Sequence, residues 1–204
     1  MLKNLFFMLS FVQDRDHING IKNYTITCYL EDKKTMDHLV YSVNKALENG
    51  NYIAALYLSL TLPDICARIE SADHKTSKTK YIEWFNAYLS HQYKHRIGSQ
   101  KKEHVFLTGD DLYALRCAVL HEGRLDISKQ NAKKIHDKFF FTIGHPHLRQ
   151  INSTLQLDLP IFCKEICDGV SKWVETNKNN KDIKDKLEEL LSIFSGDSFS
   201  TNGF

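Results

Sequence analysis

One arginine inside an otherwise apolar run constrains the fold of this chain more than any other feature. Between Leu112 and Leu120, Arg116 is the only residue that is neither apolar nor aromatic. A helix that is apolar on every side is packed among other elements. Burying an arginine there is costly unless a carboxylate, a phosphate or a water-filled cleft receives its charge. The fold must therefore surround this helix and supply a partner for Arg116.

The ends of this helix are marked in the sequence. Asp110 and Asp111 precede the apolar run, where negative charge stabilises a helix N-terminus, and Gly123 follows it, where a left-handed residue ends a helix. His121 lies five residues after Arg116, which is about 140° around an ideal helix. Because arginine is long and the last helical turn is free to unwind, the two side chains can still meet in one cleft.

The sequence of this segment, Leu-Arg-Cys-Ala-Val-Leu-His-Glu-Gly from Leu115 to Gly123, resembles that of the HEPN superfamily of nucleotide-binding and RNase domains. It is most similar to members from phages, plasmids and bacterial mobile elements. The resemblance is sharpest over 112–123 and weaker over the rest of about 35–173. It implies that Arg116 and His121 cleave RNA without metal or other cofactor, in a composite site at a homodimer interface. Many catalytic members carry a polar residue after the arginine, whereas this chain has Cys117.

Arginine and histidine are the residue types that cleavage of RNA through its own 2′-hydroxyl requires. Histidine transfers protons near neutral pH, and arginine stabilises the charge that builds on the phosphorane. The alternative is that His121 merely ends the helix while Arg116 pairs with a buried acid, for which the candidates are Asp64, Glu70, Glu83 and Glu122. We take Arg116 and His121 as the predicted catalytic pair.

Two neighbours of the pair have open roles. Glu122 is expected either to orient His121 or pair with Arg116, or simply to be exposed at the helix end. Arg124 is expected either to contact phosphate or to complement the helix C-terminus.

The most basic stretch of the chain is 91–104, which holds four lysines and arginines and three histidines against one glutamate. Such a run is usually a solvated connector. Because it directly precedes the candidate catalytic helix, it is also the predicted RNA-contacting surface. Its four cations are Lys94, Arg96, Lys101 and Lys102.

Apolar periodicity predicts a mainly α fold, a HEPN-like helical bundle with an appended β-hairpin. The expected domains are an N-terminal appendage (1–34) with a possible strand, a helical domain (35–194) that includes a hairpin over 138–159, and a flexible tail (195–204). Thr35 is a possible first cap, and 128–137 could form a short helix. An aromatic stripe at helical spacing predicts a core face on a helix from about Lys78, and it consists of Tyr81, Trp84, Phe85, Tyr88 and Leu89. A last amphipathic helix is predicted over 183–194 by Ile183, Leu187, Leu190, Leu191 and Phe194. Pro63 is expected to kink or restart the second helix, with Thr61 or Asp64 as the new cap.

Composition limits the function classes. With 27 Lys and Arg against 25 Asp and Glu, the net charge of +2 makes no general case for nucleic-acid binding, so any such surface is local. Five scattered cysteines indicate a reduced, cytoplasmic protein, and the apolar N-terminal run is too short to span a membrane. His145, His147, Cys163 and Cys167 are residue types that bind zinc, but both cysteines fall on an apolar helix face, so we expect no metal.

Two functions follow from these observations. The first is a metal-independent endoribonuclease or RNA-binding HEPN protein of a defence, toxin or mobile-element system, acting as a homodimer with RNA as substrate and an antitoxin as a further partner. The second is a catalytically silent helical bundle that binds a protein or nucleic acid. They differ in whether Arg116 and His121 face a shared open groove or a sealed intrachain ion pair.

Overall fold

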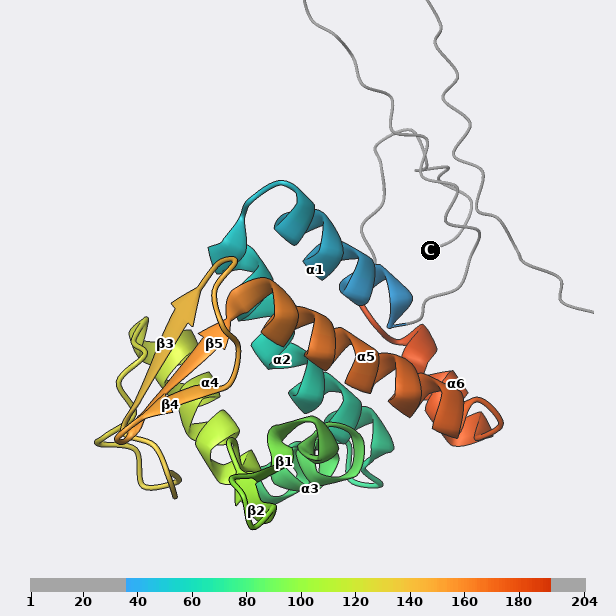
Figure 1. Cartoon of the computed structure of the whole chain (residues 1–204). Coiled ribbons are helices and arrows are strands. Elements are labelled where there is room, and N and C mark those ends of the chain that lie inside the picture. Colours follow the sequence, from blue (N-terminus) through green and yellow to red (C-terminus); the bar gives the residue numbers. More distant parts are fainter. Residues whose placement is uncertain (1–35, 192–204) are drawn as a thin grey trace, which may run out of the picture. The chain divides into compact units, whose positions relative to one another are not determined.

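The computed structural model describes residues 36–191, which form a mainly α-helical bundle with two small sheets (Figure 1). The predicted appendage (1–34) with its strand, the Thr35 cap and the tail (195–204) lie outside the described residues.

Helix α2 (Tyr52–Glu70) is the central helix of the bundle. It packs against α1 (Asp37–Glu48), α3 (Lys78–Tyr88), α4 (Gly109–Glu122) and α5 (Leu159–Asn177), and Figure 1 shows α2 and α5 crossing the middle of the domain together. By length and composition α2 could cross a membrane, but half of its apolar window is buried among the other helices. Packing within the bundle therefore accounts for its apolar character.

Of the two alternatives for Pro63, a kink or a restart of the helix, the restart is wrong. α2 continues through Pro63, which is itself buried. Thr61 does not cap a new helix, because its hydroxyl donates to the Leu58 carbonyl at 2.7 Å, and Asp64 instead binds a side chain from another helix. Proline removes one backbone hydrogen bond, and burial of α2 among four helices compensates for that local cost.

The predicted core stripe and helix ends are confirmed in α3 and α4. Tyr81, Trp84 and Phe85 of α3 are buried. In α4 the Thr108 side chain accepts from the Asp111 backbone N–H, and Gly123 ends the helix in the left-handed region with φ +64°. Local capping chemistry thus fixes the length of the helix that carries Arg116 and His121.

The predicted hairpin over 138–159 is wrong in its pairing. β3 (Lys138–Thr142) pairs in parallel with β5 (Thr154–Asp158), and β4 (Arg149–Ile151) pairs antiparallel with β5, so the strand order is β3-β5-β4. Only β4 and β5 form a hairpin. β5 leads directly into α5, whose N-terminus is capped by the Asp158 side chain.

Two other segments differ from expectation. The basic stretch is not a plain connector, since it forms a short 3-10 helix η1 (Ser90–Tyr93) and a hairpin of β1 (Lys94–Ile97) and β2 (Lys102–Val105). The helix expected over 128–137 is absent, and the segment consists of turns and bends. Where the periodicity over 183–194 predicts a helix, the structure forms α6 (Lys181–Glu188), and residues 192–194 lie outside the described residues.

A fully buried carboxylate explains why 128–137 is not helical. Asp111 accepts hydrogen bonds from the backbone N–H groups of Lys134 at 2.7 Å and Ile135 at 3.1 Å, and from the Thr108 hydroxyl at 2.6 Å. These N–H groups are therefore satisfied by α4 instead of by a local helix. The interaction ties the segment before β3 to the start of α4.

Asp111→Ala is therefore expected to lower the free energy of unfolding by about 1–3 kcal/mol, because it leaves these N–H donors without an acceptor. Urea denaturation of the full chain measures the change. The matched control is Asp185→Ala on the exposed face of α6, which should change stability by less than about 0.5 kcal/mol. Equal effects of the two substitutions would contradict the anchoring role.

Candidate functional site

The candidate site lies where α4 crosses α2. Arg116 Nε of α4 donates to Asp64 Oδ2 of α2 at 2.7 Å. The Arg116 and Asp64 side chains are 20% and 13% exposed, so the ion pair is mostly, but not fully, removed from water. Asp64 was one of the acids that the sequence offered as a partner for Arg116, and the structure selects it.

Further contacts, from α3 and the loop before it, hold the ion pair in place. The Thr76 hydroxyl, in the loop before α3, donates to Asp64 Oδ1 at 3.1 Å, so both carboxylate oxygens are occupied. Tyr81 is buried beside the pair and packs edge-on against Tyr113, with 5.5 Å between ring centroids. The guanidinium is thus fixed in position and orientation by groups from three elements.

The surroundings of Arg116 shift its pKa in two opposing ways. Burial lowers the pKa of the guanidinium, but the Asp64 carboxylate more than offsets this and raises the pKa above its ordinary value. The neighbouring Cys117 side chain also interacts with the guanidinium. Burial raises the pKa of Tyr113, which interacts with Cys117 as well. Arg116 is therefore a permanent cation, with an uncharged phenol one turn before it.

His121 contacts the outer side of the same guanidinium. Arg116 Nη1 lies 3.0 Å from His121 Nε2. Because a guanidinium can only donate, Nε2 is the acceptor and the proton of the neutral ring is on Nδ1. His121 is exposed, in the last turn of α4. The site thus directs Nε2 of an exposed imidazole at a fixed cation.

The arrangement combines features of both interpretations of the sequence. The Asp64 ion pair is the one that a purely structural role for Arg116 requires. The contact with His121 is the one that a catalytic role requires, and it lies at the solvent-exposed side of the pair. Arg116 is therefore not sealed inside the chain.

Glu122 and Arg124 lie beside the pair but bond to each other. Arg124 Nη1 donates to Glu122 Oε2 at 3.2 Å, and Gln130 donates to Glu122 Oε1 at 2.8 Å. Both carboxylate oxygens of Glu122 are therefore occupied by groups other than His121. Arg124 is 44% exposed and also lies 4.0 Å from Asp126.

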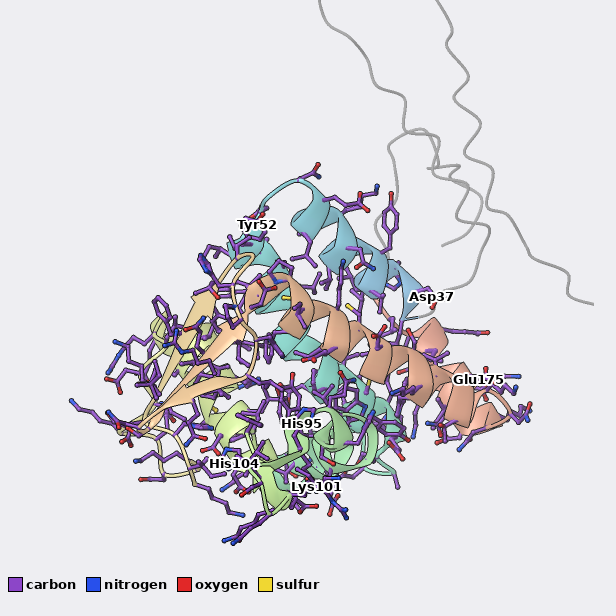
Figure 2. All side chains as sticks on the ribbon, viewed as in Figure 1. Asp37, Tyr52, His95, Lys101, His104 and Glu175 are labelled. Carbon is purple, nitrogen blue, oxygen red and sulfur yellow. The ribbon has the colours of Figure 1, made fainter. Side chains whose placement is uncertain are left out.

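The other predicted RNA-contacting residues lie at the opposite end of α4. Lys94, Arg96, Lys101 and Lys102 are exposed on the β1–β2 hairpin, and Arg96 faces Glu103 across it. Figure 2 shows Lys101 at this hairpin, far from Tyr52 at the start of α2. The hairpin precedes the N-terminus of α4, whereas His121 is in its last turn, about 20 Å along the axis. One chain does not bring these cations next to His121.

Of the residues weighed as zinc ligands, His147 has other partners and the two cysteines are buried. His147 Nδ1 accepts from the Asp158 backbone N–H at 3.2 Å, and its Nε2 lies 3.3 Å from Glu165. Burial raises the pKa of Cys163 to about 11 and that of Cys167 to about 12. Over residues 36–191, no group of three or more histidine, cysteine, aspartate or glutamate side chains is arranged to hold a metal ion.

Two residues of the site were not predicted from the sequence. Thr76 lies in an exposed loop and carries no pattern that marks it. Tyr113 is one residue of the apolar run over 112–120, and nothing in the sequence distinguishes it from its neighbours there. The role of Asp64 had a usable signal, because it is the only acid between Tyr52 and Ile69 in α2, as Arg116 is the only base within 112–120.

No protein-family model, curated protein or solved structure matches this chain.

The two members of the pair should differ in their effect on stability. Arg116→Ala leaves Asp64 mostly buried without its cation and is expected to lower the free energy of unfolding by about 1–3 kcal/mol. His121→Ala removes an exposed side chain and should change it by less than about 0.5 kcal/mol. Thermal and urea denaturation measure both. A comparable loss for His121→Ala would indicate that His121 is a structural residue.

Proposed function

We propose that this protein is a metal-independent endoribonuclease of HEPN type that uses Arg116 and His121. The observation that carries the proposal is the 3.0 Å contact between Arg116 Nη1 and His121 Nε2 at a solvent-exposed position. It joins a proton acceptor to a fixed cation, which are the two groups that transphosphorylation of RNA requires. The resemblance around Arg116 adds RNA as substrate, a cytoplasmic defence, toxin or mobile-element system as context, and an antitoxin as a protein partner.

In the proposed reaction, a substrate phosphate takes the guanidinium donors that His121 now occupies. His121 Nε2 is then free to remove the proton from the 2′-hydroxyl, and the 2′-oxygen attacks the adjacent phosphorus. The bond from phosphorus to the 5′-oxygen breaks, and that oxygen takes up a proton. The products are a 2′,3′-cyclic phosphate and a 5′-hydroxyl. Asp64 acts as a positioning residue, because it holds Nε and leaves the outer edge of the guanidinium for phosphate.

One copy of the site supplies one histidine, whereas the reaction needs a base for the 2′-hydroxyl and an acid for the 5′-oxygen. A homodimer with two facing copies would supply both. An exposed apolar pair on α2 supports this assembly. Ile53 is 68% and Tyr57 is 37% exposed, and they lie one turn apart on the same helix face. The Tyr57 hydroxyl is 3.7 Å from where a Cβ on Gly123 would lie, so the pair adjoins the end of α4.

The first prediction concerns the chemistry. His121→Ala is expected to reduce RNA cleavage by about 10²-fold or more while leaving RNA affinity nearly unchanged, because it removes only proton transfer. Arg116→Ala should reduce both cleavage and affinity. Wild-type cleavage should persist in EDTA, leave cyclic phosphate ends and spare DNA, which lacks the attacking hydroxyl.

The measurement is incubation of the full chain with a single-stranded RNA and its DNA counterpart, with and without chelator. Unpaired RNA should be preferred, since a stacked A-form helix holds the 2′-oxygen out of line. Cutting of DNA, or loss of cleavage in EDTA, would refute the mechanism.

The second prediction concerns assembly. Light scattering at micromolar concentration should give a dimer, and Ile53→Glu should give a monomer that no longer cleaves RNA, because it places a charge in the proposed interface. The control is Ile97→Glu on the β1–β2 hairpin, where Ile97 is 45% exposed; this variant should remain dimeric and active. A wild-type chain that stays monomeric with and without RNA argues against the composite site.

The Asp64 ion pair supports a second candidate function. Because Arg116 already has a carboxylate partner, the same geometry is compatible with a catalytically silent bundle that binds a protein or nucleic acid. A protein that binds RNA with unchanged affinity after His121→Ala, and never cleaves it, would favour this second function.

A further inference from the structure

The β3–β5–β4 sheet packs one face on the helical core, and its other face is partly covered at Gln156, whose side chain donates to the Pro146 carbonyl at 3.2 Å. Phe139, Leu155 and Leu157 are fully buried on the core face. Because successive residues of a strand point to opposite faces, Phe140 projects from the other face, where its side chain remains accessible and the residue is 52% exposed. An aromatic ring held open to solvent on a paired strand is a rigid, flat contact surface.

Two cations flank this ring. Lys138 lies two residues earlier in β3 and therefore projects from the same face. On the other edge of β3, the segment that follows α4 runs antiparallel, with an isolated bridge between Asp126 and Lys138 and backbone hydrogen bonds on either side of it. Continuing this register two residues back places Arg124 across from Phe140.

Two exposed acids, Glu122 and Asp126, lie near these cations, and Asp126 also interacts with Lys138 across the bridge. Arg124 contacts Glu122 at 3.2 Å and Asp126 at 4.0 Å. The Arg124 side chain is 44% exposed and the Asp126 side chain is 46% exposed. The Asp126 carboxylate is also occupied by the backbone N–H of Ser128 at 2.9 Å and by its hydroxyl at 2.5 Å. Ion pairs this exposed are worth little, so a phosphate can replace Glu122 at Arg124 at small cost.

Arg124 connects this surface to the candidate catalytic pair along the chain. Arg124 follows His121 by three residues, across the tight turn at Gly123. A single strand of RNA whose phosphate reaches Arg116 and His121 would therefore meet Arg124 and then Phe140 next. Aromatic side chains stack unpaired bases, and neighbouring cations bind the backbone phosphates. A protein partner fits this surface less well, because the centres of protein interfaces are depleted in charge.

We propose that Phe140 stacks on the unpaired base of a nucleotide beside the bond that is cut, while Arg124 and Lys138 bind the flanking phosphates. This proposal rests on the proposed ribonuclease function and adds a substrate contact to it. It explains a preference for single-stranded RNA by a positive interaction, since a paired base inside a duplex offers no free face to the ring.

The test uses the full chain with His121→Ala, so that RNA is bound but not cut, and a short single-stranded RNA that the wild-type protein cleaves. Phe140→Leu should weaken the Kd by at least about fivefold, whereas Phe140→Trp should retain it. The control Ile97→Ala, on the β1–β2 hairpin, should leave the Kd unchanged. Replacing nucleotides one at a time by abasic ones should reveal one position at which loss of the base weakens binding in the parent but not in Phe140→Leu.

The outcomes separate this proposal from the function on which it rests. If the parent binds RNA and Phe140→Leu binds equally well, or if both show the same abasic penalty, the stacking surface is refuted while the ribonuclease proposal stands. If the wild-type chain neither cleaves nor binds any RNA, the proposed function fails and the stacking surface fails with it.

Discussion

The ion pair between Arg116 and Asp64 determines how α4 faces α2, the central helix of the domain. Asp64 is the only acid between Tyr52 and Ile69 and Arg116 is the only base between Leu112 and Leu120, and neither charge can be buried without the other. Thr76 adds the loop before α3 to the same cluster. Orientation of the guanidinium follows from this, because Asp64 holds Nε and Nη1 is left to face His121 at the exposed end of α4.

The same pair connects stability with the proposed chemistry. A cation that must bind a phosphorane is most effective when it is already oriented, and Asp64 supplies that orientation without blocking the outer edge of Arg116. The carboxylate also reduces the net positive charge that a phosphate would meet. The Arg116–Asp64 pair therefore favours precise positioning of the guanidinium over strong electrostatic attraction. Attraction of the substrate depends on other cations.

Those cations lie in two separate regions of the domain. The β1–β2 hairpin adjoins the N-terminus of α4. Arg124 and Lys138 adjoin its C-terminus, because the chain leaves α4 through the turn at Gly123 and pairs with the edge of β3. The small net charge of +2 conceals this local distribution. Only the second region is continuous with His121 in one chain, so the β3 edge is the more direct extension of the candidate site.

The sequence by itself determined the features that depend on neighbouring residues. Helical periodicity and capping residues predicted the core stripe of α3 and the ends of α4, and the lone Arg116 predicted the need for a buried partner. Tertiary structure decided which partner it was, because Asp64 lies 52 residues away and was one of four candidate acids. It also decided that β3 pairs with β5, that 128–137 is held by Asp111 instead of forming a helix, and that α2 continues through Pro63. These outcomes depend on packing and hydrogen bonds between distant segments, whose free energies outweigh local preferences and leave no periodic pattern in the chain.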